Sequence, residues 1–189
     1  MKAKTIQSTP INFTRPALIT GGILLIPFIG TQVSREMNWS AFDFIVIGIL
    51  LFGATLAYEL ISSRVNNSAY KIATGVAVVT AVLLMWVNLA VGIIGSEDNP
   101  ANALYLGVLA AGLFGTIISQ LKPSGMAKTL FVAAVLQMLV PVIAIVTINP
   151  AITSDPPGIV GVLTLNSFFA MLWTSSGILF QKASKVNSK

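Results

Sequence analysis

Six apolar stretches alternate with short polar segments along the whole chain. A transmembrane helix needs roughly 20 predominantly apolar residues, and each stretch is long enough to meet that requirement. The predicted helices cover residues 17–33, 42–62, 70–95, 101–121, 126–148 and 158–180. The pattern therefore predicts an all-α fold, a polytopic membrane bundle of six transmembrane helices that forms a single transmembrane domain over residues 1–189.

The polar breaks carry the residues that start helices. Ser40 is followed three residues later by Asp43, which is the spacing of a capping box. Asn99 stands directly before Pro100, as expected for an N-cap followed by proline at the first helical position. Both sites therefore predict helix starts next to tight connections. We expect the first apolar stretch to remain as a helix, because it is longer than the 7–15 residue apolar core of a secretory signal.

Composition supports the membrane interpretation. The chain is 55% hydrophobic and 9% charged, where a soluble domain carries about 25% charged residues, and its mean hydropathy is +0.87. At roughly 20 residues per crossing, the 189 residues suffice for six crossings and leave no room for a separate extramembrane domain. These values exclude a soluble globular protein.

The chain contains neither Cys nor His. Their absence removes thiol nucleophiles, disulfides, haem ligation by imidazole and nearly all zinc and copper sites. The sequence also lacks a Gly-x-Ser-x-Gly elbow and a phosphate-binding glycine loop. We therefore predict that the protein is not an enzyme, and we expect no catalytic residues, no metal site and no cofactor.

Charge asymmetry predicts the orientation of the bundle. Lys and Arg residues in short loops favour the cytoplasmic side of a membrane. Of the eleven Lys and Arg residues, all but Arg35 fall on the side of the N-terminus, whereas every acidic residue except Glu59 falls on the opposite side. Both termini should therefore be cytoplasmic. Glu59 is expected to pair with Lys71 or Arg64 across the neighbouring connection.

Aromatic residues give a partly independent indication, because Trp and Tyr favour the two membrane interfaces. Tyr105 falls at the predicted outer edge of its helix and is expected at that interface. Trp173 lies well inside its helix, so we expect it to pack within the bundle or to face lipid tails.

Small residues recur every four positions along the stretch 101–121. In lipid the hydrophobic effect does not drive one helix to associate with another, so close packing in a membrane depends on small residues that let backbones approach. We therefore expect this helix to be the central, buried one and its row of small residues to be a packing seam. The row consists of Ala103, Gly107, Ala111, Gly115 and Ser119.

Hydrogen-bonding residues concentrate toward the predicted outer surface. Asn88 and Asn166 both fall roughly 10–12 Å below the outer helix ends at 1.5 Å per residue, and Pro141 frees the carbonyl of Gln137 at a similar level. One hypothesis is a shallow polar pit with an acidic mouth that holds a cation or steers a cationic ligand. Its residues would be Asn88, Glu97, Asp98, Asn99, Asn102, Gln137 and Asn166.

The alternative hypothesis for the same residues is structural. Amide side chains inside a membrane protein commonly serve as hydrogen-bond glue between helices, worth about 0.6–2 kcal/mol each. Two carboxylates also fall short of the six to eight oxygen ligands that Ca²⁺ prefers. The sequence leaves both interpretations open.

The run from Trp86 to Asn102, WVNLAVGIIGSEDNPAN, resembles a family of small bacterial multi-pass inner-membrane proteins whose activity is uncharacterised. Shorter patches such as Tyr58-Glu59-Leu60 and Ala69-Tyr70-Lys71 are similar to the same family, and the likeness extends over about residues 17–182. The resemblance implies a bacterial source and a location in the inner, cytoplasmic membrane. It implies no activity, substrate or ligand set.

The distribution of ionisable residues narrows the function classes further. Coupled transporters normally keep an ionisable residue near the middle of the membrane, whereas every charged residue here falls at or near a helix end. We therefore expect an accessory, scaffold or ligand-sensing protein that acts through helix contacts within the membrane. The alternative is an oligomeric channel or passive transporter for a cation or small solute, with Glu97 and Asp98 at its outer mouth.

The expected partners follow from this class. They are the lipid bilayer, together with a membrane-protein partner or further copies of the same chain. Nucleic acid is excluded, because binding it would need a folded basic patch and no extramembrane segment is large enough to supply one.

Overall fold

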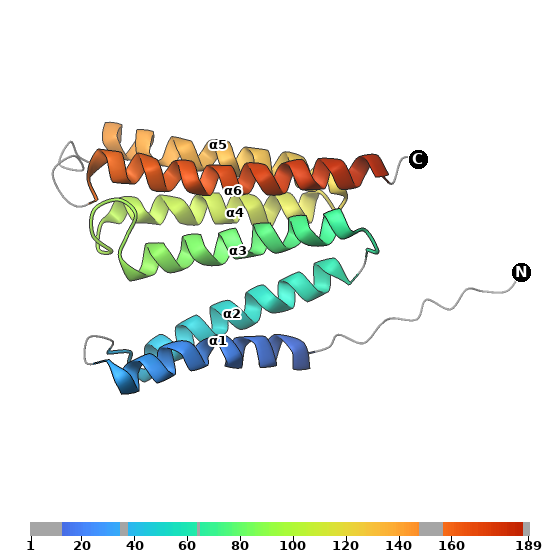
Figure 1. Ribbon diagram of the computed structural model, residues 1–189. Coiled ribbons are helices and arrows are strands. Elements are labelled where there is room, and N and C mark those ends of the chain that lie inside the picture. The colour runs from blue at the N-terminus through green and yellow to red at the C-terminus, as the bar shows by residue number, and fades with distance from the viewer. Residues whose placement is uncertain (1–12, 35–37, 64, 148–156, 187–189) are drawn as a thin grey trace, which may run out of the picture. The chain divides into compact units, whose positions relative to one another are not determined.

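Helices make up the regular secondary structure of the computed structural model, which describes residues 13–34, 38–63, 65–147 and 157–186 (Figure 1). No strand occurs in these ranges. The elements are α1 (Thr14–Val33), α2 (Ala41–Ser62), α3 (Ser68–Ala90), the short 3-10 helix η1 (Pro100–Ala103), α4 (Leu104–Ile118), α5 (Pro123–Thr147) and α6 (Gly158–Val186). Six helical segments, with η1 and α4 forming one of them, are long and apolar enough to cross a membrane. The prediction of an all-α fold with six candidate membrane spans is confirmed.

Local backbone geometry explains where the helix ends differ from the prediction. α3 ends at Ala90 instead of running on to residue 95, because Gly92 and Gly95 take left-handed φ angles of +71° and +64°. α4 ends at Ile118 because Gln120 and Leu121, at φ 51° and 61°, turn the chain back toward α5. α6 continues to Val186, beyond the end of its apolar run.

Both predicted helix starts are confirmed. The backbone N–H and the hydroxyl of Ser40 donate to Oδ2 of Asp43 at 2.7 and 2.8 Å, and the Asp43 N–H donates to the Ser40 hydroxyl at 3.3 Å. This exchange is the capping box. The Asn99 side chain accepts from the Ala101 N–H at 2.9 Å with Pro100 at the first position, although the helix that it starts is η1, which leads into α4.

The chain divides into two compact units, residues 1–60 and residues 61–189. In the first unit, α1 and α2 contact each other through side chains. A guanidinium nitrogen of Arg15 lies 3.8 Å from a carboxylate oxygen of Glu59, and the rings of Phe28 and Phe44 meet edge to face with centroids 6.4 Å apart. Because early residues of α1 contact late residues of α2, the two helices form an antiparallel hairpin.

Glu59 therefore has a partner that the sequence interpretation did not consider. It pairs with Arg15 inside its own hairpin, instead of with Lys71 as expected. The other expected partner, Arg64, lies outside the described residues. Arg15 is 72% exposed, and exposed ion pairs contribute only about 0–1 kcal/mol.

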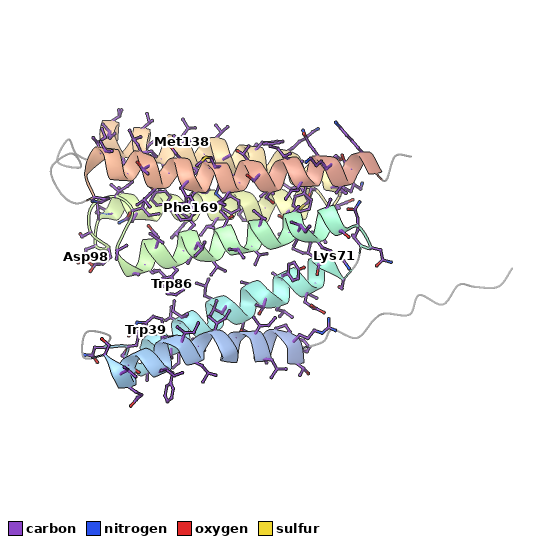
Figure 2. All side chains as sticks on the ribbon, viewed as in Figure 1. Trp39, Lys71, Trp86, Asp98, Met138 and Phe169 are labelled. Carbon is purple, nitrogen blue, oxygen red and sulfur yellow. The ribbon has the colours of Figure 1, made fainter. Side chains whose placement is uncertain are left out.

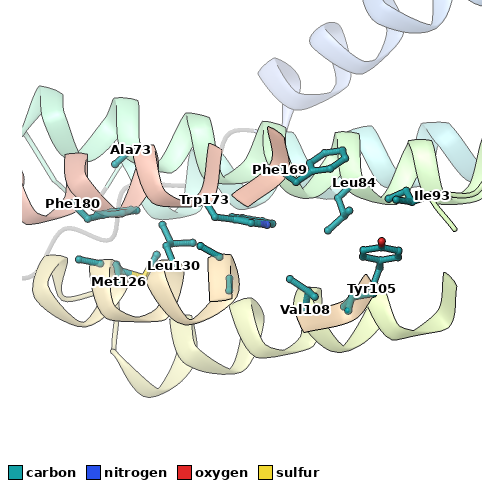
Figure 3. Close-up of a cluster of buried hydrophobic side chains, with 14 of the residues drawn as sticks. Ala73, Leu84, Ile93, Tyr105, Val108, Met126, Leu130, Phe169, Trp173 and Phe180 are labelled. Atoms are coloured by element: carbon teal, nitrogen blue, oxygen red, sulfur yellow. The ribbon is translucent and has the colours of Figure 1, made fainter. Parts of the chain in front are cut away.

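The second unit is a bundle of α3, α4, α5 and α6 in which α5 and α6 each pack along two neighbouring helices. α6 packs along both α5 and α3, whereas α4 packs mainly on α5. On the α3 side, the rings of Tyr70 and Phe180 meet at a centroid distance of 4.9 Å, and the Ser176 hydroxyl donates to the Ala73 carbonyl at 2.7 Å. Figure 3 shows Ala73 and Phe180 in the same apolar cluster.

The prediction that α4 is the central, buried helix is wrong. Ala103 and Gly107 are exposed, and α4 buries Tyr105 and Val108 instead. The reason is geometric: a row of residues spaced by four drifts about 40° around the helix at each step, so its first and last members lie on nearly opposite faces.

Only the later part of the predicted row of small residues forms a packing seam. A Cβ at Gly115 would overlap the side chain of Thr129 on α5, and a Cβ at Gly125 of α5 would lie 2.6 Å from the Cβ of Ser119. A Cβ at Gly107 would meet nothing within 4 Å. Ala111, between these two regions, is half-buried.

Gly115→Ala should destabilise the bundle by about 1–3 kcal/mol, because the added methyl group must displace Thr129 or separate α4 from α5. Gly107→Ala is the matched control, and it should leave stability unchanged or raise it by up to about 1 kcal/mol through helix propensity. Reversible unfolding in mixed micelles, followed by circular dichroism, measures both. Equal effects of the two substitutions would refute the assigned seam.

Candidate functional site

The connection between α3 and η1 is built around the side chain of Asn102. Its Oδ1 accepts from the backbone N–H groups of Ile93 and Ile94 at 3.0 and 2.9 Å. Its Nδ2 donates to the carbonyls of Ile94 and Ser96 at 3.3 and 2.7 Å. An asparagine side chain offers two donors and two acceptor lone pairs, and all four are used here. Asn102 is 4% exposed, so its amide replaces water for a buried loop backbone.

Gly92 permits this close wrapping of the loop. A Cβ at Gly92 would lie 2.5 Å from the Ser96 carbonyl oxygen and 2.7 Å from Nδ2 of Asn102, and the residue has a positive φ of +71°. Both the space and the backbone conformation therefore demand glycine at this position.

Asn88 supports the loop from α3. Its Nδ2 donates to the backbone carbonyl of Asn102 at 3.2 Å. Its Oδ1 is buried and has no hydrogen-bond partner among the described residues, and the side chain as a whole is 9% exposed. A buried acceptor without a donor costs about 1–3 kcal/mol, so this position holds a polar group at a cost to stability.

A second polar cluster joins α4, α5 and α6 inside the bundle. Oδ1 of Asn166 accepts from the Tyr105 hydroxyl at 3.1 Å and from Nε2 of Gln137 at 3.0 Å. Nδ2 of Asn166 donates to the same hydroxyl at 2.9 Å and to the Val162 carbonyl at 2.8 Å. Nε1 of Trp173 donates to Oε1 of Gln137 at 3.4 Å. The cluster therefore links three helices through side chains that are at most 4% exposed.

Tyr105 and Trp173 were not among the predicted site residues. Figure 3 shows both rings inside the apolar cluster, Tyr105 from α4 and Trp173 from α6. Tyr105 lies in the first turn of α4, the helix end at which it was predicted, and its ring is fully buried with its hydroxyl bonded to Asn166. Trp173 packs within the bundle, which is one of the two positions expected for it. The only sequence signal for the cluster is that each member is a polar group inside an apolar run.

The structure distributes the predicted pit residues over separate places. Asn88 and Asn102 support the loop, whereas Gln137 and Asn166 belong to the interhelical cluster. Asn99 caps η1. The two acids, Glu97 and Asp98, are exposed on the loop between α3 and η1.

The chemistry of this region favours protein-internal hydrogen bonding over ligand capture. Within the described part of the chain, no hydrogen bond links the Asn102 loop to the Asn166 cluster, and the amides of Asn102, Gln137 and Asn166 are engaged with protein groups. No three acidic side chains of the described residues come together in a group that could hold a metal ion. The arrangement favours the interpretation that the amides act as hydrogen-bond glue.

Comparison of the chain with protein-family models, with curated proteins and with solved structures gives no match. The resemblance carried by the run Trp86–Asn102 therefore stays a prediction.

Asn102→Ala should destabilise the second unit by about 2–4 kcal/mol, because it leaves two N–H groups and two carbonyls of a buried loop without partners. Asn99→Ala is the control on the same loop, since it removes one capping bond and should cost about 0.5–2 kcal/mol. Unfolding in mixed micelles gives the stabilities, and limited proteolysis reports whether the loop opens. A smaller effect for Asn102→Ala than for Asn99→Ala would contradict its central role.

Proposed function

We propose that this protein is a multi-pass integral protein of the bacterial inner membrane that acts as an accessory, scaffold or ligand-sensing protein through helix contacts within the membrane. The observation that carries the proposal is that the described buried polar groups of the second unit, apart from Oδ1 of Asn88, hydrogen-bond to other protein groups and include no acid or base of the kind that drives coupled transport. The resemblance of the run Trp86–Asn102 supports the bacterial inner membrane as the location.

Charged side chains support the proposal by their positions. In the described part of the chain, each one lies in a connection or within about two turns of a helix end: Arg15, Asp43, Glu59, Lys71, Glu97, Asp98, Lys122, Lys128, Lys182 and Lys185. A residue that couples transport to protons or ions would be expected near the middle of the membrane, where ionisable side chains are costly to bury and are found mainly at functional sites. The described bundle offers no such residue.

Apolar faces supply the contacts that a scaffold would use. α4 exposes Leu113, Phe114 and Ile117, and α5 exposes Val132, Val135 and Val142. In the first unit, Leu18 and Ile26 of α1 are 70% and 71% exposed. Such surfaces suit lipid tails or the helices of a partner, and small residues such as the open Gly107 and Gly112 let a second backbone approach closely.

The proposed orientation places both termini in the cytoplasm. Figure 2 shows Lys71 and Asp98 at opposite ends of the second unit. The other described lysines share the end of Lys71, and Glu97 shares the end of Asp98, because the helices run antiparallel. The lysine end is the one expected to face the cytoplasm.

The absence of cysteine from the chain allows a direct test of this orientation. Ser96→Cys and Ser124→Cys place single thiols on exposed residues at the two ends of the second unit. In spheroplasts, a membrane-impermeant maleimide should label the thiol at 96, whereas the thiol at 124 should react only after lysis. Labelling with the opposite sidedness would refute the orientation.

Flux measurements separate the scaffold from the channel alternative. Purified protein in proteoliposomes should pass K⁺, Na⁺ or Ca²⁺ no faster than empty liposomes do, because the bundle interior is closed by its own side chains. A flux that disappears in the double variant Glu97→Gln, Asp98→Asn would instead establish a channel with an acidic mouth. Gln and Asn keep the size of the side chains and remove only the charges, so loss of flux in this variant is assigned to charge.

Crosslinking in the native membrane then tests the scaffold role itself. A photo-crosslinking residue at exposed Leu113 of α4 should give an adduct of one defined mass with a membrane protein or with a second copy of this chain. The same probe at Ala133, which is fully buried in α5, is the control and should crosslink only within the chain. Adducts with lipid alone at exposed positions on all six helices would overturn the scaffold proposal.

A further inference from the structure

Lysines gather at one end of the second unit at matching depths. On α6, a Cβ at Gly177 would lie 3.0 Å from the ring of Phe131, which sets the register of α5 against α6. Lys128 therefore lies level with about residue 180 of α6, close in depth to Lys182. The contact of Tyr70 with Phe180 sets the register of α3 against α6 in the same way. This register places Lys71 level with about residue 179 of α6.

The resulting band of lysines is narrow along the bundle axis. Lys71, Lys128 and Lys182 lie within about one helical turn, or ~5 Å, of each other along the axis. Lys122 and Lys185 lie about one turn further toward the same end. The whole band spans roughly 10 Å at 1.5 Å per residue, which is comparable to the polar headgroup layer of one leaflet.

No described carboxylate of the second unit lies at this end. Its described acidic residues, Glu97 and Asp98, are both on the loop at the opposite end. Lys122, Lys128 and Lys182 are exposed, so their ammonium groups reach the surface of the bundle. A positive band at headgroup depth is complementary to anionic phosphate groups.

We propose that this band, made by Lys71, Lys122, Lys128 and Lys182, binds the headgroups of anionic phospholipids in the leaflet that it faces. The amines act as point charges that hold lipid phosphates against the ends of α3, α5 and α6. The inference rests on the proposed function as a membrane-spanning protein, and it names anionic phospholipids as the lipid class that this protein binds selectively. Free phosphate and an acidic protein segment share the same charge, and the experiment below distinguishes them from lipid.

The test uses the full chain purified in an uncharged detergent. Native mass spectrometry counts the phosphatidylglycerol or phosphatidylcholine molecules retained at increasing lipid concentration, and thermal unfolding in the same mixtures reports stabilisation. The wild type should retain phosphatidylglycerol in preference to phosphatidylcholine. This preference should weaken as salt is raised, because exposed charges are screened.

The decisive variant is the triple substitution Lys122→Gln, Lys128→Gln, Lys182→Gln. Each lysine near an anionic surface contributes about a fivefold gain in affinity, so the triple variant should bind phosphatidylglycerol about a hundredfold more weakly. The matched control replaces the same three residues with Arg, which keeps the charges and should keep the binding. If the triple variant does not fold, the single change Lys128→Gln should lower the affinity about fivefold.

Three results would overturn the proposal. The first is equal retention of the two lipids by the wild type. The second is equal phosphatidylglycerol binding by the Gln and Arg variants. The third is stabilisation by inorganic phosphate, or by a polyglutamate peptide, that matches the stabilisation by phosphatidylglycerol. Binding is measured in micelles, so a failure here leaves the flux and crosslinking tests of the proposed function unaffected.

Discussion

A hydrogen-bonding group that leaves water for hydrocarbon must find its partner inside the protein. This constraint governs the second unit at two places. In the loop between α3 and η1, the Asn102 amide satisfies four backbone groups that a turn in water would leave to solvent. In the bundle, Asn166 gathers polar groups from α4 and α5 onto α6. Asn102 therefore sets the shape of the loop, and Asn166 ties α4 and α5 to α6.

The helical spans follow from the sequence because they depend on a single property that can be read residue by residue. An apolar run of sufficient length must be helical to satisfy its own backbone in a membrane. The capping groups of Ser40 and Asn99 are equally local, since each bonds a residue two or three positions away. For these features, the spacing of residues along the chain is enough to predict the geometry.

The contacts between helices do not follow from the sequence in the same way. Asn102 stands in a loop rich in polar residues, and nothing in its spacing distinguishes it from Asn99 as the organiser of the backbone. Tyr105 was assigned to the interface because its distance from a helix end was known but the face that it occupies was not. The order of the helices in the bundle likewise depends on which of them pack together, and the spacing of small residues on α4 did not determine that order.

The packing of α6 against both α3 and α5 also has a consequence for biosynthesis. α6 follows α3 and α5 in the chain and leaves the ribosome after them, yet both of these helices pack along it. Until it inserts, the Ala73 carbonyl of α3 lacks the Ser176 hydroxyl, and Gln137 of α5 lacks Asn166. The side chain of Gln137 therefore lacks its partners Asn166 and Trp173 until α6 joins the earlier helices, and the bundle closes only in that later step.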